Sequence, residues 1–331
     1  MANGRKKAGG NRRPKGKKKT GGRSGKHSWL WPAIVLGILL LTLTAAFVVL
    51  VLRPYQNNKA SQARVDLGTE PPIHYEEKGQ TPEVAILNNS GKKHDVPPSS
   101  IPARPENKPS AADLPPIAIV IDDMGYQLKT GEELLDLDLD LTFAFLPHGP
   151  HTEQLAARAK KRGRDILLHF PMEPADQKCD PGPGAVTISM SRAQIGKILA
   201  ENLRLVPLAL GINNHMGSRF TQNQEAMQNF LELVRARHLF FLDSMTSQSS
   251  VGYFLAREMG VKTTRRNVFL DNVRETGPIT EQIEKLLKVA DKQGWAVGIG
   301  HPYPQTFAAL RGARKEILRR VRMVGVSELV H

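Results

Sequence analysis

The pattern of hydrophobic and polar positions divides the chain into three parts. Residues 29–52 form one uncharged and mostly apolar run, residues 53–115 are polar, and residues 116–331 alternate short apolar runs with segments of helical period. The 24 residues of the first run are more than a helix needs to cross roughly 30 Å of hydrocarbon. We predict a transmembrane helix over 29–52, because a secretory signal peptide has a shorter apolar region and a clear cleavage site.

The second part is predicted to be a tether. Eleven prolines lie between residues 53 and 116, several of them in Pro-Pro pairs among Asn, Ser, Lys and Glu. Such a segment cannot bury enough apolar surface to offset its ordering entropy, so we predict a disordered linker over 53–115. The domain that follows, 116–331, is large enough for one substantial core.

The charge is concentrated at one end of the chain. The formal net charge is +14, but residues 1–28 hold 11 Lys and Arg and no Asp or Glu, which leaves 35 basic against 32 acidic side chains. This balance argues against a nucleic-acid-binding fold, and no nucleic acid partner is expected. The positive-inside rule predicts that 1–28 is a cytoplasmic tail, that 29–52 contacts membrane lipid, and that the domain is periplasmic or extracellular. The single Cys179 excludes a disulfide framework and a Cys-rich zinc module.

The pattern over 116–331 predicts β/α units around a mainly parallel sheet. The predicted strands are 117–121, 141–146, 165–169, 209–213, 239–242, 267–270 and 296–299, and the predicted helices are 153–162, 192–205, 224–237, 251–259, 279–293 and 307–321. Seven strands with interleaved helices predict an incomplete (β/α) barrel, one strand short of eight.

An Asp or a His lies at or just after the end of every predicted strand. In chain order these are Asp122-Asp123, His148, His169, His215, Asp243, Asp271 and His301. Each alone could cap a helix or form a turn. Because the ends of parallel strands meet at one mouth of a barrel, the series together indicates a site, most economically a metal with acid and base groups around it.

The residue types favour Zn²⁺ or another first-row divalent ion. Imidazole and carboxylate groups are its ligands, and a catalytic site takes three of them and keeps one position open. A carboxylate on strand one and histidines on later strands make an Asp-His-His set feasible. Adjacent carboxylates such as Asp122 and Asp123 point in different directions along a strand, so that one can bind the metal while the other works on water.

Six motifs carry a family resemblance. They are IVIDDMG at 119–125, HFPMEP at 169–174, NHMGS at 214–218 with Thr221, FLDS at 241–244, FLDN at 269–272 and GHPYP at 300–304. In this order the domain resembles the divergent polysaccharide deacetylases, the YibQ-like branch of the NodB-homology (carbohydrate esterase family 4) superfamily. The resemblance covers about residues 116–330 and leaves out the anchor and the tether.

The resemblance implies roles for individual residues. Asp122 corresponds to the catalytic base, Asp123 to a metal ligand, and His169 to the first of two histidine ligands spaced four apart. The second of these positions holds Glu173 here, so either Glu173 or His215 would complete the set, and we favour His215. His301 corresponds to the general acid.

Four more residues are expected to support the site. We expect Asp243 or Asp271 to orient His301 through a hydrogen bond, without touching the substrate. Asn214 follows the predicted strand four and would lie at the same mouth. His148 follows the predicted strand two and either lines the mouth or caps a loop.

The resemblance implies a membrane-anchored, metal-dependent hydrolase that removes acetyl groups from an envelope glycan, with zinc as the best-fitting metal. The superfamily's Arg-x-Pro motif after strand four is absent, and Glu173 replaces its second histidine. A non-catalytic envelope protein that binds glycan or a protein partner in the same pocket is therefore the alternative. The retained base and acid, Asp122 and His301, favour the enzyme.

Overall fold

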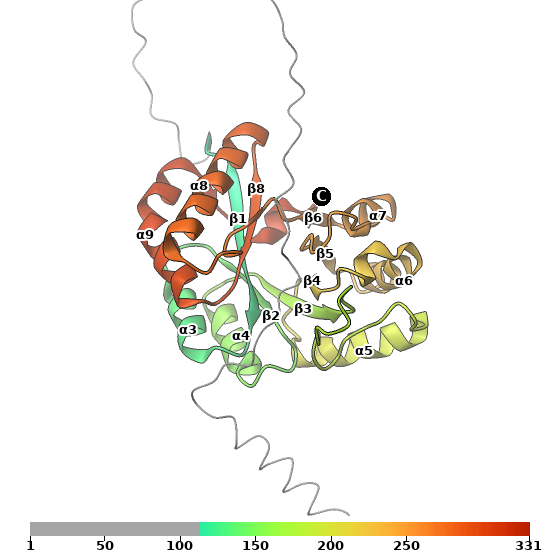
Figure 1. The fold of residues 1–331 in the computed structure, drawn as a ribbon. Coiled ribbons are helices and arrows are strands. Elements are labelled where there is room, and N and C mark those ends of the chain that lie inside the picture. The colour runs from blue at the N-terminus through green and yellow to red at the C-terminus, as the bar shows by residue number, and fades with distance from the viewer. Residues whose placement is uncertain (1–112) are drawn as a thin grey trace, which may run out of the picture. The chain divides into compact units, whose positions relative to one another are not determined.

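Nine parallel strands form one curved sheet in residues 113–331, the part of the chain that the computed structural model describes (Figure 1). The strands are β1 (Pro116–Met124), β2 (Thr142–Phe145), β3 (Ile166–Met172), β4 (Gly211–Met216), β5 (Phe240–Asp243), β6 (Thr263–Arg265), β7 (Val268–Phe269), β8 (Ala296–Gly300) and β9 (Arg322–Met323). Their order across the sheet is β6-β5-β4-β3-β2-β1-β8-β7, and β9 pairs with the start of β1. The sheet is thus an incomplete parallel barrel.

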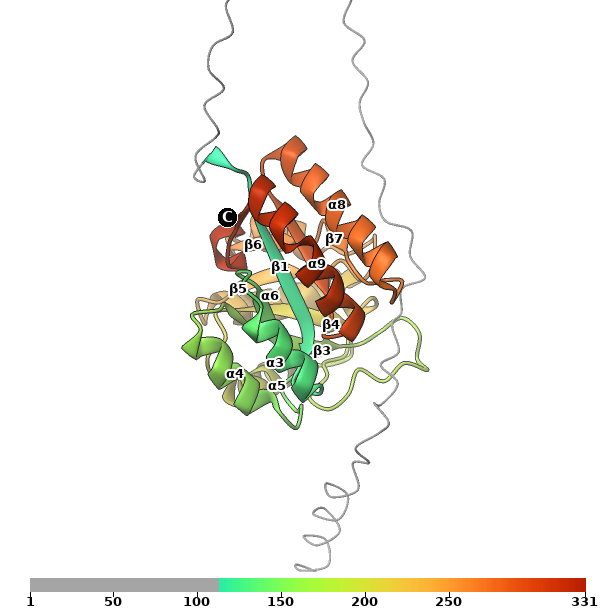
Figure 2. The same cartoon turned by 90° about the vertical axis from the view of Figure 1, so that its left-hand side faces the viewer.

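Seven α-helices of the described residues surround the curved sheet (Figures 1 and 2). They are α3 (Leu128–Asp136), α4 (Thr152–Lys161), α5 (Arg192–Leu205), α6 (Gln224–Arg235), α7 (Gly252–Glu258), α8 (Thr276–Gln293) and α9 (Pro304–Arg320). The six predicted helices and seven predicted strands all occur, with ends that differ by no more than three residues. Helix α3 was not predicted.

The predicted number of strands is wrong, because two short strands were missed. One is β9, and the other is β6, which pairs with β5 at one edge of the barrel while β7 pairs with β8 at the other. The backbone crosses between the two edges at Arg266, whose N–H donates to Asp243 O (3.0 Å), and Asn267, whose N–H donates to Val297 O (2.8 Å). The two edges are therefore linked by the chain itself, and β6 and β7 do not pair with each other.

Strand residues alternate between two apolar layers. Ile117, Ile119 and Ile121 of β1 belong to the layer that packs against the helices. Ala118 and Val120 belong to a second, smaller cluster formed by the other face of the strands. The C-terminal segment supplies Val324, Val326 and Leu329 to that inner cluster, so it fills the barrel interior below the mouth.

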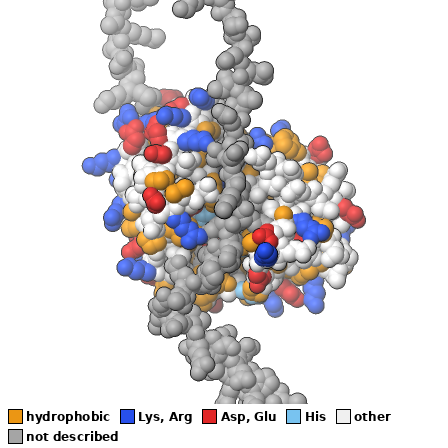
Figure 3. All heavy atoms as spheres, in the orientation of Figure 1, with side chains coloured by type: hydrophobic (Ala, Val, Ile, Leu, Met, Phe, Trp, Pro, Cys, Tyr) orange, Lys and Arg blue, Asp and Glu red, His pale blue; other side chains and the backbone are white. Residues whose placement is uncertain are grey.

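The described residues carry a mixed surface. Basic and acidic side chains are intermingled on the face shown in Figure 3. Ion pairs such as Arg320–Glu284 (2.9 Å) join α9 to α8. On this face, the distribution agrees with the near-neutral balance of the chain after residue 28.

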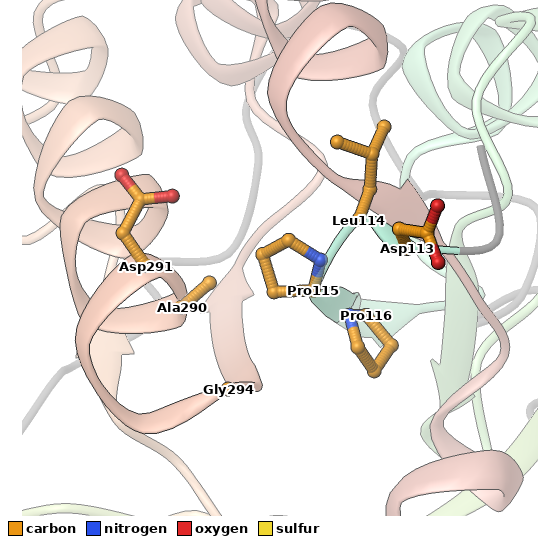
Figure 4. Close-up of a pocket in the computed structure, with 7 residues that line it drawn as sticks. All are labelled: Asp113, Leu114, Pro115, Pro116, Ala290, Asp291 and Gly294. Carbon is orange, nitrogen blue, oxygen red and sulfur yellow. The ribbon is translucent and has the colours of Figure 1, made fainter. Parts of the chain in front are cut away.

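A hollow of about 450 Å³ lies where β1 begins, at the N-terminal end of that strand (Figure 4). It is lined by Asp113, Leu114, Pro115, Pro116, Ala290, Asp291 and Gly294. These residues lie at the start of β1 and the end of α8, and none of them was predicted to belong to the site. The hollow is therefore distinct from the predicted site residues, which lie at the C-terminal ends of the strands.

The predicted tail 1–28, the predicted transmembrane helix 29–52 and most of the predicted linker 53–115 lie outside the described residues. Within residues 113–331, no helix has both the length and the apolar character needed to cross a bilayer.

Candidate active site

The alternation along each strand brings polar side chains to the C-terminal mouth of the barrel. Asp122 comes two residues after Val120, His169 two after Leu167, and His301 two after Ile299, all on the inner face. All three side chains are buried. Asn213 and His215 follow the same parity on β4, and Ser244 follows Leu242 of β5. At the C-terminal ends of the strands, the inner apolar cluster is therefore followed by a layer of carboxylates, imidazoles and an amide.

Asp123 reaches this layer through an irregularity of the backbone. Its φ is 52°, in the left-handed region, and the register of β1 against β2 shifts between Ile121 and Met124. Such a bulge re-aims a side chain that regular alternation would turn to the other face. The predicted divergence of the two carboxylates does not occur. Both approach His169 Nε2, Asp123 Oδ1 at 3.1 Å and Asp122 Oδ2 at 3.7 Å.

Asp123, His169 and His215 bring three ligand atoms to one point. Asp123 Oδ1 lies 3.1 Å from His169 Nε2 and 3.0 Å from His215 Nδ1, and the two nitrogens are 3.2 Å apart. A tetrahedral zinc with bonds of about 2.0–2.1 Å separates its ligand atoms by about 3.3 Å. One carboxylate and two imidazoles also suit other first-row divalent ions. The three residues therefore fit a divalent metal by spacing and by donor chemistry.

Asn213 fixes how His169 faces this point. Its Oδ1 accepts from His169 Nδ1 (2.9 Å), while its Nδ2 donates to Asp122 Oδ1 (2.8 Å) and Ser244 Oγ (3.1 Å). A carbonyl oxygen only accepts, so Nδ1 carries the hydrogen and the lone pair of the neutral ring lies on Nε2. A histidine that ligates a metal commonly donates its other N–H to an oxygen in this way.

Asp271 holds His301, which follows β8, the strand next to β1. Its Oδ1 accepts from His301 Nδ1 (2.9 Å), and its Oδ2 accepts from the His301 backbone N–H (2.6 Å) and Thr306 Oγ1 (2.7 Å). Burial alone would lower the pKa of His301, but the carboxylates of Asp271, Asp123 and Asp122, with Asp271 contributing most, together raise that pKa to about 9. His301 Nε2 then points a proton toward the site, 3.9 Å from Asp123 Oδ2.

The pKa values of the two neighbouring carboxyl groups are shifted in opposite directions. Burial raises the pKa of Asp122, an effect that the nearby His169 only partly offsets. Burial also acts on Asp123, but His215 and His169 outweigh it and hold the pKa of Asp123 well below its ordinary value. Paired titratable groups whose pKa values are pushed apart are typical of acid and base assignments. Asp123 is suited to be a permanent anion, and Asp122 to exchange a proton.

Asp243 lies on the outer face of the sheet and does not orient His301. It shares the parity of Phe241, which faces the helices. Its carboxylate accepts from Met245 N (2.9 Å), Ser250 Oγ (2.7 Å) and Tyr253 N (2.9 Å). Of the two residues proposed to orient His301, the structure places Asp271 there and uses Asp243 to fix the loop before α7.

Three further predicted residues lie in the supporting loops. Asn214 accepts from Ser244 N (2.9 Å) and donates to Met216 O (2.8 Å), so it joins β4 to the loop after β5. Glu173 accepts from Ile188 N (2.7 Å) and pairs with Arg219 (3.2 Å), away from the three ligand atoms. His148 is exposed at the mouth.

Sequence reasoning missed the roles of Asn213, Ser244 and Thr306, and it did not single out Tyr126. The parity of His215 already placed Asn213 on the inner face of β4, and this signal could have found it. Tyr126 follows the β1 bulge, and burial together with the Asp123 carboxylate raises the pKa of its phenol. Nothing in its spacing marks it, because its loop has no regular period.

Comparisons with known proteins match this same part of the chain. The sequence model of a family described as divergent polysaccharide deacetylase matches residues 119–330. An uncharacterized protein of Haemophilus influenzae is 36% identical over 214 residues, which cover 64% of this chain and 76% of that protein. The uncharacterized protein YibQ of Escherichia coli is 33% identical over 215 residues, 65% of this chain and 67% of that protein.

A solved structure is similar as well. The crystal structure of an uncharacterized protein from Agrobacterium tumefaciens C58 superposes with a TM-score of 0.61 and 26% sequence identity, covering 67% of this chain and 92% of that protein. The family match spans every residue of the site described above, from Asp122 to His301.

Proposed function

The chain belongs to the divergent polysaccharide deacetylase family, and we propose that it is a metal-dependent hydrolase that removes acetyl groups from a glycan. One observation carries the proposal. The ligand atoms of Asp123, His169 and His215 converge beside a buried carboxylate, Asp122, and a buried imidazole, His301. A base and an acid next to a point that can hold a metal are what acyl transfer to water requires.

Asp123, His169 and His215 would hold the ion, for which zinc is the best fit. When bound, a divalent ion supplies a Lewis acid that activates water and polarises the acyl carbonyl. Asp122 takes the proton of the attacking water, and its burial-raised pKa brings it closer to the pH at which it works. Asn213 keeps the Asp122 carboxylate in place through its 2.8 Å hydrogen bond.

His301 delivers the proton that the leaving nitrogen or oxygen needs. Its pKa of about 9 keeps it protonated at neutral pH. The contact with Asp271 occupies Nδ1, so the proton on Nε2 is the one that faces the site. Base and acid therefore come from the ends of two neighbouring strands, β1 and β8, at the same mouth.

We further propose that the domain works on the outer side of a membrane. The support is the sequence alone, in which a basic tail (1–28) precedes an apolar segment (29–52) and a proline-rich tether (53–115). This arrangement makes an acetylated glycan of the cell envelope the substrate class and makes lipid a partner of residues 29–52. It corresponds to a single-pass protein with a periplasmic or extracellular domain.

The test uses the full-length chain purified in detergent. Bound metal is measured first, and acetate release from an acetylated chito-oligosaccharide is then compared between wild type and Asp122→Asn. We expect the variant to keep its metal and to lose about 10²–10⁴-fold in rate, the usual contribution of a general base. The exposed Asp138→Asn serves as the matched control and should match wild type.

Two results would refute the hydrolase. One is an unchanged rate in Asp122→Asn. The other is wild-type protein that holds metal, folds, and yet releases no acetate from any acetylated glycan tested, a result that would favour a non-catalytic glycan-binding protein.

A further inference from the structure

Ser244 brings a hydroxyl group to the mouth whose hydrogen the fold does not use. The residue comes two positions after Leu242 on β5, so its side chain lies on the inner face. Its backbone is held by two contacts, from its N–H to Asn214 Oδ1 (2.9 Å) and from Arg266 Nε to its carbonyl oxygen (2.6 Å). Its Oγ accepts from Asn213 Nδ2 (3.1 Å), but among residues 113–331 no group accepts the hydrogen of this hydroxyl.

The rest of the network fixes the direction of the Asn213 contact. Asn213 Oδ1 accepts from His169 Nδ1 (2.9 Å), so the other terminal atom of this amide is the nitrogen, which only donates. That nitrogen gives one hydrogen to Asp122 Oδ1 (2.8 Å) and the other to Ser244 Oγ. Ser244 is therefore the acceptor in this contact, and its own O–H remains available to a bound molecule.

The hydroxyl is as accessible as the groups assigned to the chemistry. The exposed fraction of Ser244 is 5%, against 3% for Asp122 and 5% for His301. A molecule that reaches the proposed base and acid thus meets Ser244 at the same depth. A buried donor without an acceptor is unfavourable, and an oxygen of a bound molecule would remove that penalty.

We propose that Ser244 donates a hydrogen bond to a hydroxyl or ether oxygen of the sugar that carries the acyl group. The acyl oxygen itself belongs at the point where Asp123, His169 and His215 converge. Ser244 is separated from His169 by the side chain of Asn213, so its hydroxyl suits an oxygen further along the substrate. The inference rests on the proposed function and deepens it, because Ser244 becomes the residue that distinguishes an acetylated sugar from other acetylated compounds.

Calorimetry of the zinc-loaded, full-length chain tests the contact. The probe is N-acetylchitotetraose, titrated in the cold so that turnover is slow. Ser244→Ala should weaken its affinity about threefold to tenfold, the usual effect of losing one neutral hydrogen bond. Ser244→Thr keeps the O–H and should bind the sugar like wild type. The matched control is Ser249→Ala, which changes an exposed serine of the same loop and should leave the affinity unchanged.

Rates on two kinds of acetyl compound separate a substrate contact from a merely structural role. Ser244→Ala should lower kcat/KM for N-acetylchitotetraose about threefold to tenfold and leave kcat/KM for p-nitrophenyl acetate, which has no sugar, unchanged. Bound zinc and Tm are measured on the same samples. An equal loss on both substrates would assign Ser244 to the fold of the loop and overturn the inference.

Unchanged sugar affinity in Ser244→Ala would also overturn the inference, as would equal weakening in Ser244→Thr or a wild type that does not bind the sugar. Acetate release by wild type decides the proposed function separately. Sugar binding that depends on the Ser244 hydroxyl, without acetate release, keeps the assignment of Ser244 and refutes the hydrolase. Acetate release with a sugar affinity that is independent of Ser244 does the reverse.

Discussion

Asp271 decides which form of His301 the substrate meets. This carboxylate contributes most among the three that raise the pKa of His301 to about 9 against the opposing effect of burial. In Asp271→Asn the burial remains and the charge is gone, so the pKa must fall. Activity that needs the protonated ring should then be lost at lower pH than in wild type, and the difference should be largest between about pH 7 and 9. The measurement is kcat/KM for acetate release across about pH 5 to 10.

The control for this profile is Asp138→Asn, which changes an exposed partner of Arg314 in the segment between α3 and β2. Its alkaline limb should coincide with that of wild type. An unmoved alkaline limb in Asp271→Asn would mean that His301 does not act as the acid.

Asn213 links a proposed metal ligand to the proposed base, which makes it the most informative amide of the site. Asn213→Ala removes the acceptor of His169 Nδ1 and the donor of Asp122 together. Loss of such a partner commonly lowers metal affinity by about 10–100-fold. Competition with a chelator measures that affinity, and the absorption spectrum of cobalt-loaded protein reports the ligand geometry independently of turnover. Asn202→Ala, a buried amide bonded to Gly184 O instead, should bind metal like wild type. Unchanged affinity and spectrum in Asn213→Ala would leave Asn213 no positioning role.

Residue identities at the mouth could be predicted, because parallel strands end together and alternation decides which side chains face inward. This reasoning applies to Asp122, His169 and His301, which all continue the inner apolar face. It could not place Asp123, whose position depends on a left-handed φ that no spacing reveals. Asp243 is two residues after Phe241, so alternation along the strand could have placed it on the outer face from the sequence alone.

At the scale of elements, the strongly periodic segments were predictable and the short ones were not. β6 is Thr-Thr-Arg, three residues with no apolar side chain, and its pairing with β5 depends on long-range contacts. α3 carries Gly131 in its interior, which weakens the helical signal, yet Leu134 and Leu135 are buried against the rest of the core. Tertiary packing determined both elements.

The loop between β5 and α7 depends on one carboxylate. Asp243→Asn keeps the size of the side chain but replaces one acceptor oxygen with a donor, so either the bond from Met245 N or the bonds from Ser250 and Tyr253 are lost. Leaving buried donors without an acceptor costs about 1–3 kcal/mol of unfolding free energy. Denaturant unfolding should show that loss, with faster amide hydrogen exchange in residues 244–253. Asp138→Asn, an exposed ion-pair partner, should lose less than about 1 kcal/mol. Equal losses in the two variants would contradict the role assigned to Asp243.

At the scale of the whole molecule, the three ligand atoms come from β1, β3 and β4, so a bound ion would tie together strands that are 46 to 92 positions apart in sequence. Only the folded domain brings these atoms together, so metal binding must stabilise it. At a free zinc concentration of about 100 times Kd, the gain is about 2.7 kcal/mol. For a domain of this size, that gain corresponds to a rise in Tm of roughly 5–10 °C. Calorimetric melting of the full-length chain with zinc and with a chelator measures the rise. His215→Ala should abolish it, whereas Asp291→Asn, which changes only the α8–α9 surface, should retain it. Zinc that raises the Tm of His215→Ala as much as that of wild type would have to bind elsewhere.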